Sequence, residues 1–150
     1  MNKFQEGIYI KDRGREELLE LLKGRQDRFG YLSREFLVEV SNSLSLSVGE
    51  VYGVATFYSF LSTKPLGSHV IRICKSVPCF LKDSQIIIEC IKEELGISLG
   101  ETTADGKFSF YLTNCIGACD RAPAMMINND VYGDLTPRKI SRILGEYHRA

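Results

Sequence analysis

The chain has 150 residues, of which 44% are hydrophobic and 25% charged, a composition typical of a soluble globular protein with one ordinary or two small domains. Its 19 basic residues balance 19 acidic ones, so no long-range field favours nucleic acid or an anionic membrane. No apolar run approaches the roughly 18 residues of a membrane span, and the N-terminus lacks the apolar core of a signal peptide. We therefore expect a cytoplasmic protein that neither binds nucleic acid nor inserts directly into a membrane.

The first part of the chain predicts an N-terminal helical bundle over residues 1–62. Apolar residues recur at helical spacing, and they do so in three segments, 14–30, 33–46 and 47–60. The third segment opens with a capping box, in which Ser47 and Glu50 bond each other's backbone N–H groups. Its apolar residues surround most of the helix, so we expect cover from the second half of the chain or from a partner protein.

A polar segment with Pro65 and Gly67, residues 62–68, indicates a linker, and the hydrophobic period then changes. The pattern predicts, in order, strand 69–74, helix 83–96, strand 107–115, two short strands within 124–135 and helix 136–149. The two short strands are predicted to be joined by a hairpin turn at Asn128-Asn129-Asp130. Helices packed on one small mixed sheet would make an α/β domain of thioredoxin-like size over residues 63–150.

Four of the five cysteines follow predicted strand ends. Cys74 ends the first strand and Cys79 comes after four intervening residues, whereas Cys115 ends the next strand and Cys119 comes after three. Neighbouring strands can bring the two pairs together, and four thiolates make a soft site that suits zinc or an iron–sulfur cluster. An odd number of cysteines in a cytoplasmic chain argues against a disulfide framework.

The spacing within each pair favours a cluster over zinc and leaves zinc open. Zinc ribbons usually separate paired cysteines by two residues, because a tight turn suits a single tetrahedral ion. Gaps of four and three residues give roomier loops, and in a [2Fe–2S] cluster each pair can bind one of the two irons. Gly117 lies between Cys115 and Cys119, where a glycine allows positive φ and a close approach of the backbone to sulfur.

The cysteine pattern, "CIGAC" followed by "AP" and the stretch "GVATFYSFLSTKPLG" over 53–67 together resemble a known family. The resemblance covers about residues 15–148. The chain resembles the thioredoxin-like [2Fe–2S] ferredoxin subunits. These include the 24-kilodalton-type subunit of NADH dehydrogenase (complex I) and the small subunit of NAD(P)-linked, often electron-bifurcating, hydrogenases and formate dehydrogenases. One departure is local, since Val77 and Pro78 stiffen the first cysteine loop and Pro78 removes one N–H donor.

This resemblance implies one [2Fe–2S] cluster with Cys74, Cys79, Cys115 and Cys119 as its ligands. It implies that the chain is an electron-transfer subunit of a multi-subunit NAD(P)H-linked oxidoreductase. The implied partner of the chain is an FMN- and NAD(H)-binding iron–sulfur subunit, and the complex would also contain hydrogenase or other catalytic subunits. The chain itself shows no Gly-rich dinucleotide loop and no phosphate cradle, so we expect no complete active site. Its short length favours a hydrogenase-type complex. The alternatives are a respiratory NADH:quinone oxidoreductase and a zinc-binding regulatory protein.

Other interpretations of single residues and segments are weaker. Cys90 falls on the apolar face of helix 83–96 with Ile86 and Ile87, which is typical of a small buried hydrophobe. His69 and His148 have no partner at a spacing that suits metal ligation. A helix-turn-helix is disfavoured because helix 48–60 carries no Lys or Arg to contact phosphates, and a thiol–disulfide oxidoreductase because no C-x-x-C occurs.

Overall fold

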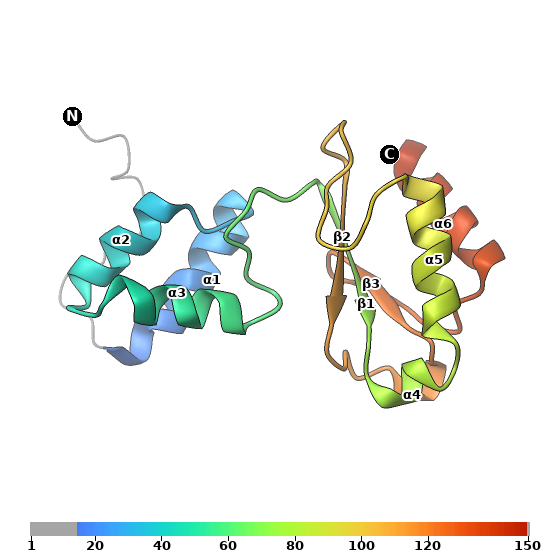
Figure 1. Cartoon of the computed structure of the whole chain (residues 1–150), viewed down its shortest axis with the longest axis horizontal. Helices are drawn as coiled ribbons and strands as arrows, with labels where there is room; N and C mark the ends of the chain where they lie inside the picture. The colour runs from blue at the N-terminus through green and yellow to red at the C-terminus, as the bar shows by residue number, and fades with distance from the viewer. Residues whose placement is uncertain (1–14, 150) are drawn as a thin grey trace. The chain divides into compact units, whose positions relative to one another are not determined.

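The computed structural model describes residues 15–149 of the chain (Figure 1). The chain divides into two compact units, Met1–Pro65 and Leu66–Ala150. The first is helical over its described residues, and the second packs helices on a single mixed sheet. The predicted fold class, a helical bundle followed by a thioredoxin-like α/β domain, is confirmed.

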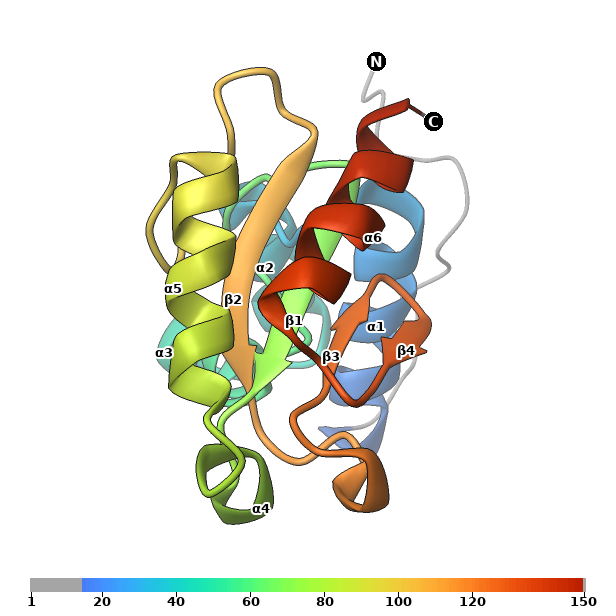
Figure 2. The ribbon, with the colours of Figure 1, turned by 90° about the vertical axis from the view of Figure 1, so that its right-hand side faces the viewer.

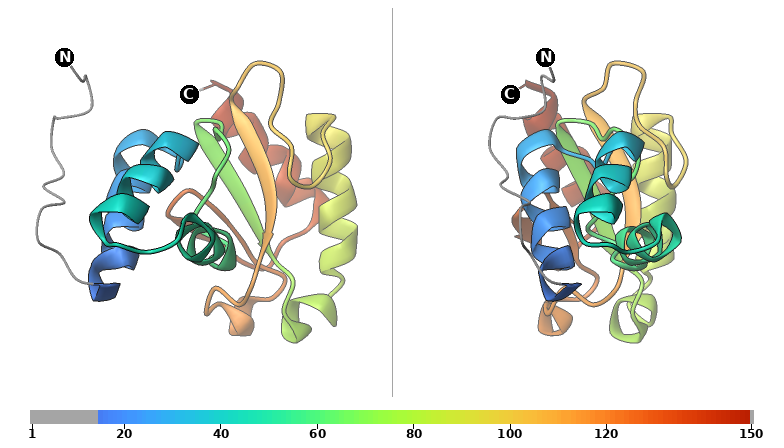
Figure 3. Two further views of the ribbon diagram at one scale, coloured as in Figure 1. Left: turned by 60° about the vertical axis from the view of Figure 1, so that its left-hand side comes forward. Right: turned by 90° about the vertical axis from the view of Figure 1, so that its left-hand side faces the viewer.

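Over residues 15–65, the first unit is built from one short 3-10 helix and three α-helices, which run from blue to green in Figure 3. They are η1 (Arg15–Glu17), α1 (Leu18–Phe29), α2 (Arg34–Ser43) and α3 (Val48–Phe57). Their apolar faces meet in one core, whose buried members are Leu18, Leu21, Leu22, Leu32, Phe36, Leu37, Val40, Leu44, Val51 and Ala55. Leucines dominate this core, as the apolar spacing predicts.

The predicted capping box at the start of α3 is present. The Ser47 hydroxyl accepts from the Glu50 N–H at 3.2 Å, and the Glu50 carboxylate accepts from the Ser47 N–H at 3.2 Å. These bonds from Ser47, together with Arg15, lower the pKa of Glu50. The helix is shorter than predicted, because Tyr58 turns to an extended conformation and its carbonyl accepts from the Leu61 N–H at 3.0 Å.

The second unit holds a four-stranded sheet with strand order β2-β1-β3-β4. The strands are β1 (His69–Cys74), β2 (Phe108–Thr113), β3 (Met125–Ile127) and β4 (Asp130–Tyr132). β1 pairs in parallel with β2 and antiparallel with β3, and β3 pairs antiparallel with β4 through the predicted hairpin. β1 is therefore a central strand, whereas β2 lies at the edge of the sheet.

Two long helices, α5 (Ser84–Leu95) and α6 (Pro137–Arg149), cover the same face of this sheet (Figures 1 and 2). The core between them and the strands consists of Ile71, Ile73, Ile87, Ile88, Ile91, Phe108, Phe110, Met125, Ile127, Leu135, Ile140, Ile143 and Leu144. Thr136 caps α6 by accepting from the Lys139 N–H at 3.2 Å. Among the helices of residues 15–149, none is both long enough and apolar enough to cross a bilayer.

Two short elements, the single-turn helix α4 (Val77–Phe80) and the 3-10 helix η2 (Cys119–Arg121), lie beyond the end of the sheet at which β1 and β2 stop. Figure 2 shows α4 below the ends of these strands and η2 in orange, on the side of β3. Periodicity did not predict either, because they are four and three residues long and a helical period shows only over several turns. Both carry a cysteine, so this end of the sheet is where the functional residues gather.

Candidate metal centre

The parallel pairing of β1 and β2 determines where the four cysteines lie. Cys74 is the last residue of β1 and stands in register with Thr113, the last residue of β2. Because parallel strands end at the same edge of a sheet, the loops that follow both strands leave from that edge. Cys79 lies in α4 after β1, and Cys115 and Cys119 lie in the segment after β2.

The strand expected over 107–115 is too long at its C-terminal end. β2 stops at Thr113, so Cys115 lies in the loop rather than in the sheet. Thr113 still accepts from the Lys75 N–H at 3.0 Å, which ties the two loops together where they leave the sheet. The first loop also differs from expectation, since Pro78 stands in the first turn of α4, where the missing N–H costs no helical hydrogen bond.

Cys74 and Cys79 form the buried pair, each with 1% of its surface exposed. They pack in a small apolar cluster with the fully buried Ala124 and the partly buried Ile116, Ala118 and Ala122. These side chains come from the second cysteine loop and from the segment after η2. The loop that carries one pair of thiols therefore covers the other pair.

Cys115 and Cys119 form the exposed pair. Their Sγ atoms lie 3.3 Å apart, and the Gly117 N–H donates to the Cys115 Sγ at 3.4 Å. Gly117 has a φ of +81°, in the left-handed region that favours glycine. The sequence prediction that this glycine brings the backbone close to sulfur is therefore confirmed.

Backbone N–H groups point at three of the four sulfurs. Ser76 and Ile116 provide them for Cys74, and Ala124 provides one for Cys79. Gly117 does the same for Cys115. Such amides stabilise negative charge on thiolates and on any metal centre they hold.

The thiols also influence one another electrostatically. Burial, with Cys74 and Cys119 nearby, raises the pKa of Cys79 to about 11. Burial also acts against ionisation of Cys74, but the amides and the Cys79 thiol outweigh it and lower the pKa of Cys74. The hydrogen bond with the Cys115 thiol raises the pKa of Cys119. Burial and the charges of Cys115 and Cys74 raise it further. The four sulfurs therefore act as one electrostatic group.

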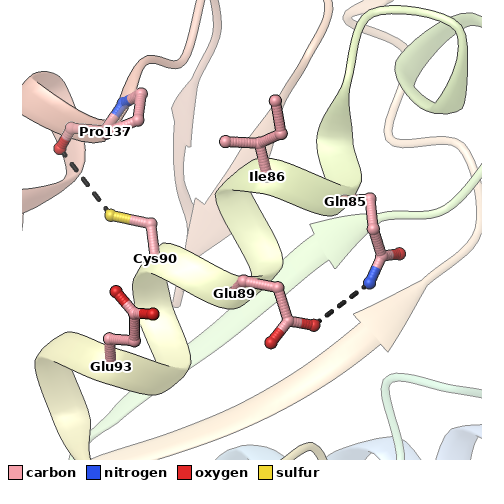
Figure 4. A pocket seen from close by; sticks show the side chains of 6 residues that line it. All are labelled: Gln85, Ile86, Glu89, Cys90, Glu93 and Pro137. Atoms are coloured by element: carbon pink, nitrogen blue, oxygen red, sulfur yellow. Dashed lines mark hydrogen bonds between the residues drawn. The ribbon is translucent and has the colours of Figure 1, made fainter.

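Cys90 lies apart from this group, on α5. Its Sγ is 3.9 Å from the Pro137 carbonyl oxygen, and it borders a shallow pocket of about 380 Å³ with Gln85, Ile86, Glu89 and Glu93 (Figure 4). Burial, with Glu94 and Glu93, raises the pKa of Cys90. The sequence expectation is met only in part. Of the two isoleucines expected beside Cys90 on the covered face, Ile87 is buried and Ile86 is exposed, and Cys90 itself is half-buried.

The donor set fits an iron–sulfur cluster. Two pairs of soft thiolates lie at the same edge of the sheet, with backbone amides on three sulfurs and apolar cover over one pair. His69 packs against Phe108 and Tyr147 at the start of β1, the opposite end of that strand from Cys74. Within residues 15–149, no three histidine, cysteine, aspartate or glutamate side chains are gathered closely enough to hold a single metal ion.

The family model described as "Thioredoxin-like [2Fe-2S] ferredoxin" matches residues 4–148, nearly the whole chain. The chain belongs to the thioredoxin-like [2Fe–2S] ferredoxin family. The cofactor of this family is a [2Fe–2S] cluster, in agreement with the soft donor set at the end of the sheet. The predicted family and cofactor are thus confirmed.

Relatives of the chain belong to oxidoreductase complexes. A subunit of the NADH-quinone oxidoreductase of Pseudomonas aeruginosa is 38% identical over 129 residues, which cover 86% of this chain and 78% of the relative. The HndA subunit of the NADP-reducing hydrogenase of Solidesulfovibrio fructosivorans is 37% identical over 130 residues, which cover 87% and 76%. Members of this family thus serve in both quinone-linked and hydrogenase complexes.

A solved structure, that of an NAD+-reducing [NiFe]-hydrogenase in the air-oxidized state, matches with a TM-score of 0.70 and 25% identity. The match covers 86% of this chain and 23% of that longer chain. Most of the present fold therefore recurs inside a hydrogenase polypeptide.

Proposed function

We propose that the chain carries one [2Fe–2S] cluster on Cys74, Cys79, Cys115 and Cys119, and that it is the electron-transfer subunit of an NAD(P)H-linked oxidoreductase complex. The observation that carries the proposal is the location of two cysteine pairs at the same sheet edge, with backbone N–H groups on three of their sulfurs. A cluster of this type, when bound, supplies a one-electron carrier.

The chain's own residues give that carrier two different surroundings. Cys74 and Cys79 would hold it on the buried side, where Ala124 and Ile116 keep water away. Cys115 and Cys119 would hold it on the exposed side, from which an electron can pass to or from another protein. The amides of Ser76, Ile116, Ala124 and Gly117 would stabilise the additional negative charge of the reduced state.

A one-electron carrier needs a partner that handles the two electrons of NAD(P)H. We therefore propose a partner subunit that binds FMN and NAD(H) and has an iron–sulfur centre of its own. One electron at a time would pass between its reduced flavin and this chain, and the two electrons together reoxidise the flavin. The proposed location is the cytoplasm, which suits five cysteines that form no disulfide.

Two apolar surfaces are available to such a partner. Beside the cysteines, Val77, Phe80 and Leu81 are 67%, 63% and 72% exposed. On the helical unit, Tyr52 and Phe57 of α3 are 50% and 79% exposed although Val51 and Ala55 of the same helix are fully buried. Large exposed apolar side chains are typical of the cores of interfaces. We propose that the helical unit docks on the flavin-bearing subunit and that the α4 surface faces its redox centre.

We propose a hydrogenase-type complex as the setting of this chain. The hydrogenase relative and the hydrogenase structure support it. A respiratory NADH:quinone oxidoreductase is the second candidate, because relatives from NADH-quinone oxidoreductases reach 38% identity in Pseudomonas aeruginosa and 40% in Buchnera aphidicola.

The first experiment is reconstitution of the full chain with iron and sulfide under anaerobic conditions. We expect two irons and two acid-labile sulfides per chain, a visible absorption band, and reduction by one electron with an EPR signal. One bound zinc and no sulfide would overturn the proposal.

The second experiment is purification of the complex from the native cell with a tagged chain. Hydrogen-dependent reduction of NAD+ or NADP+ by the purified complex would support the hydrogenase setting. Reduction of a quinone by NADH in membranes that contain the tagged chain would instead identify the respiratory setting. A complex without flavin would contradict the proposed partner.

A further inference from the structure

The turn after β4, residues 133–135, lies against the segment that carries Cys119. A Cβ atom on Gly133 would come within 2.5 Å of the Arg121 Cβ and 2.7 Å of the Arg121 carbonyl oxygen. Neither atom is the far end of a flexible side chain, so a larger residue would push the Arg121 backbone away. The φ of Gly133 is outside the left-handed region, so space rather than conformation requires glycine at this position.

Two backbone hydrogen bonds join the turn to this segment. The Asp134 N–H donates to the Arg121 carbonyl at 2.6 Å, and the Leu135 N–H donates to the Pro123 carbonyl at 3.1 Å. The Arg121 guanidinium also faces the Asp134 carboxylate at 3.6 Å, but both side chains are more than half exposed, so this ion pair contributes little. The backbone bonds and the close contact at Gly133 therefore hold the segment.

The other side of the segment is fixed to the buried thiols. The Ala124 carbonyl accepts from the Cys74 N–H at 3.1 Å, and the Ala124 N–H points at the Cys79 sulfur. Residues 119–124 are thus held between the turn on one side and the buried cysteine pair on the other. Any displacement of Arg121 by the turn must move η2, whose first residue is Cys119.

We infer that Gly133, with the Asp134 backbone N–H, positions Cys119 for the metal centre. Gly133 touches no sulfur and acts through Arg121, so it is a positioning residue. The inference rests on the proposed function in one respect, that Cys119 is a ligand of the cluster. Whether or not a cluster is bound, the turn determines where the Cys119 sulfur lies relative to the other three cysteine sulfurs.

The test compares Gly133→Ala with Gly145→Ala in the full reconstituted chain. Gly145 lies within α6 and has no atom within 4 Å of an added Cβ, so it is the matched control. We expect Gly133→Ala to shift the reduction midpoint and the EPR g values, because a displaced ligand changes the geometry at its iron. Gly145→Ala should leave both as in the wild type. Equal midpoints and g values for all three proteins would overturn the inference.

A double variant tests whether the effect passes through Arg121. Arg121→Gly removes the Cβ atom that lies nearest to the added methyl group, so Arg121→Gly combined with Gly133→Ala should return part of the way to wild-type behaviour. If Gly133→Ala alone does not fold, the double variant should fold and hold its cluster. Failure of the double variant to recover either property would contradict the inference.

A measurement on the metal-free chain separates this inference from the proposed function. The Cys115 and Cys119 sulfurs are 3.3 Å apart, so diamide, which accepts the two electrons and two protons, should join them rapidly in a disulfide. We expect slower joining in Gly133→Ala and an unchanged rate in Gly145→Ala, measured by peptide mass mapping. Equal rates would overturn the positioning role, whereas a wild-type chain that binds no cluster would overturn the proposed function instead.

Discussion

The two cysteine pairs lie at the same edge of one sheet, yet Cys74 and Cys79 are buried while Cys115 and Cys119 are exposed. The difference follows from strand position. Cys74 ends β1, a central strand with neighbours on both sides, whereas Cys115 follows β2 at the edge of the sheet. The spacing of the cysteines in the sequence does not reveal this asymmetry. The order of the strands gives one pair an anchoring environment and the other access to the surface.

The largest effect should come from removing one ligand of either pair. We expect Cys79→Ala and Cys115→Ala each to lose the cluster or to leave it labile, because one iron then lacks a thiolate. Iron and sulfide analysis with visible absorption would measure the loss. The two variants differ in a second property, since Cys79→Ala also leaves a small buried cavity, at a cost of about 1 kcal/mol in unfolding free energy. A variant that keeps two irons and full absorption would show that its cysteine is not a ligand.

The difference in burial itself can be measured in the metal-free chain. Iodoacetamide should label Cys115 and Cys119 before Cys74 and Cys79, because the buried thiols react only after a local opening. An opening free energy of about 1.4 kcal/mol is enough for a tenfold difference in rate. Time-resolved peptide mass mapping would give the four rates. Equal labelling rates would mean that Cys74 and Cys79 are not buried in the metal-free chain.

A smaller effect should follow from Gly117→Ala in the exposed loop. Alanine at a φ of +81° is strained by about 1–2 kcal/mol, and relief of that strain would move the N–H away from the Cys115 sulfur. The wild-type potential should be negative, in the region of about −400 mV for all-cysteine clusters of the plant type. Loss of an N–H donor destabilises the reduced state, so the potential of the variant should be more negative. A potential that is unchanged or higher would contradict this role for the Gly117 amide.

The smallest effect should come from Cys90→Ala, which lies outside both pairs. Cys90 is half-buried on α5, so the loss of its sulfur should cost no more than about 1 kcal/mol of unfolding free energy and leave the cluster spectrum unchanged. Denaturant unfolding and EPR would measure both properties. Bleaching of the protein by this substitution would mean that the ligand set is wrong.

The sequence predicted the features that depend on local pattern. The capping box at Ser47 and the hairpin at Asn128 are local signals, and the structure confirms both. The predicted end of α3 was wrong by three residues. Apolar residues continue through Phe60, but the backbone leaves the helix at Tyr58. Side-chain pattern alone cannot show such a change of backbone conformation.

The parts of the site that the sequence did not predict depend on tertiary contacts. The single turn of α4 is too short for periodicity to detect, and the burial of Cys79 within it depends on Ala124, far along the chain. The closeness of Gly133 to Arg121 has no signal in the sequence at all, because the φ of that glycine is ordinary. Gly117 could be predicted because its role is local to one cysteine loop.

The parallel pairing of β1 with β2 also has a consequence for the order of folding. These strands are joined through α5 and a long connection, so their pairing is a contact of high sequence separation that forms slowly. Until they pair, the two cysteine loops have no common edge at which to meet. We therefore expect the proposed cluster to be inserted after the central sheet has formed, and by way of Cys115 and Cys119, which are exposed in the folded chain.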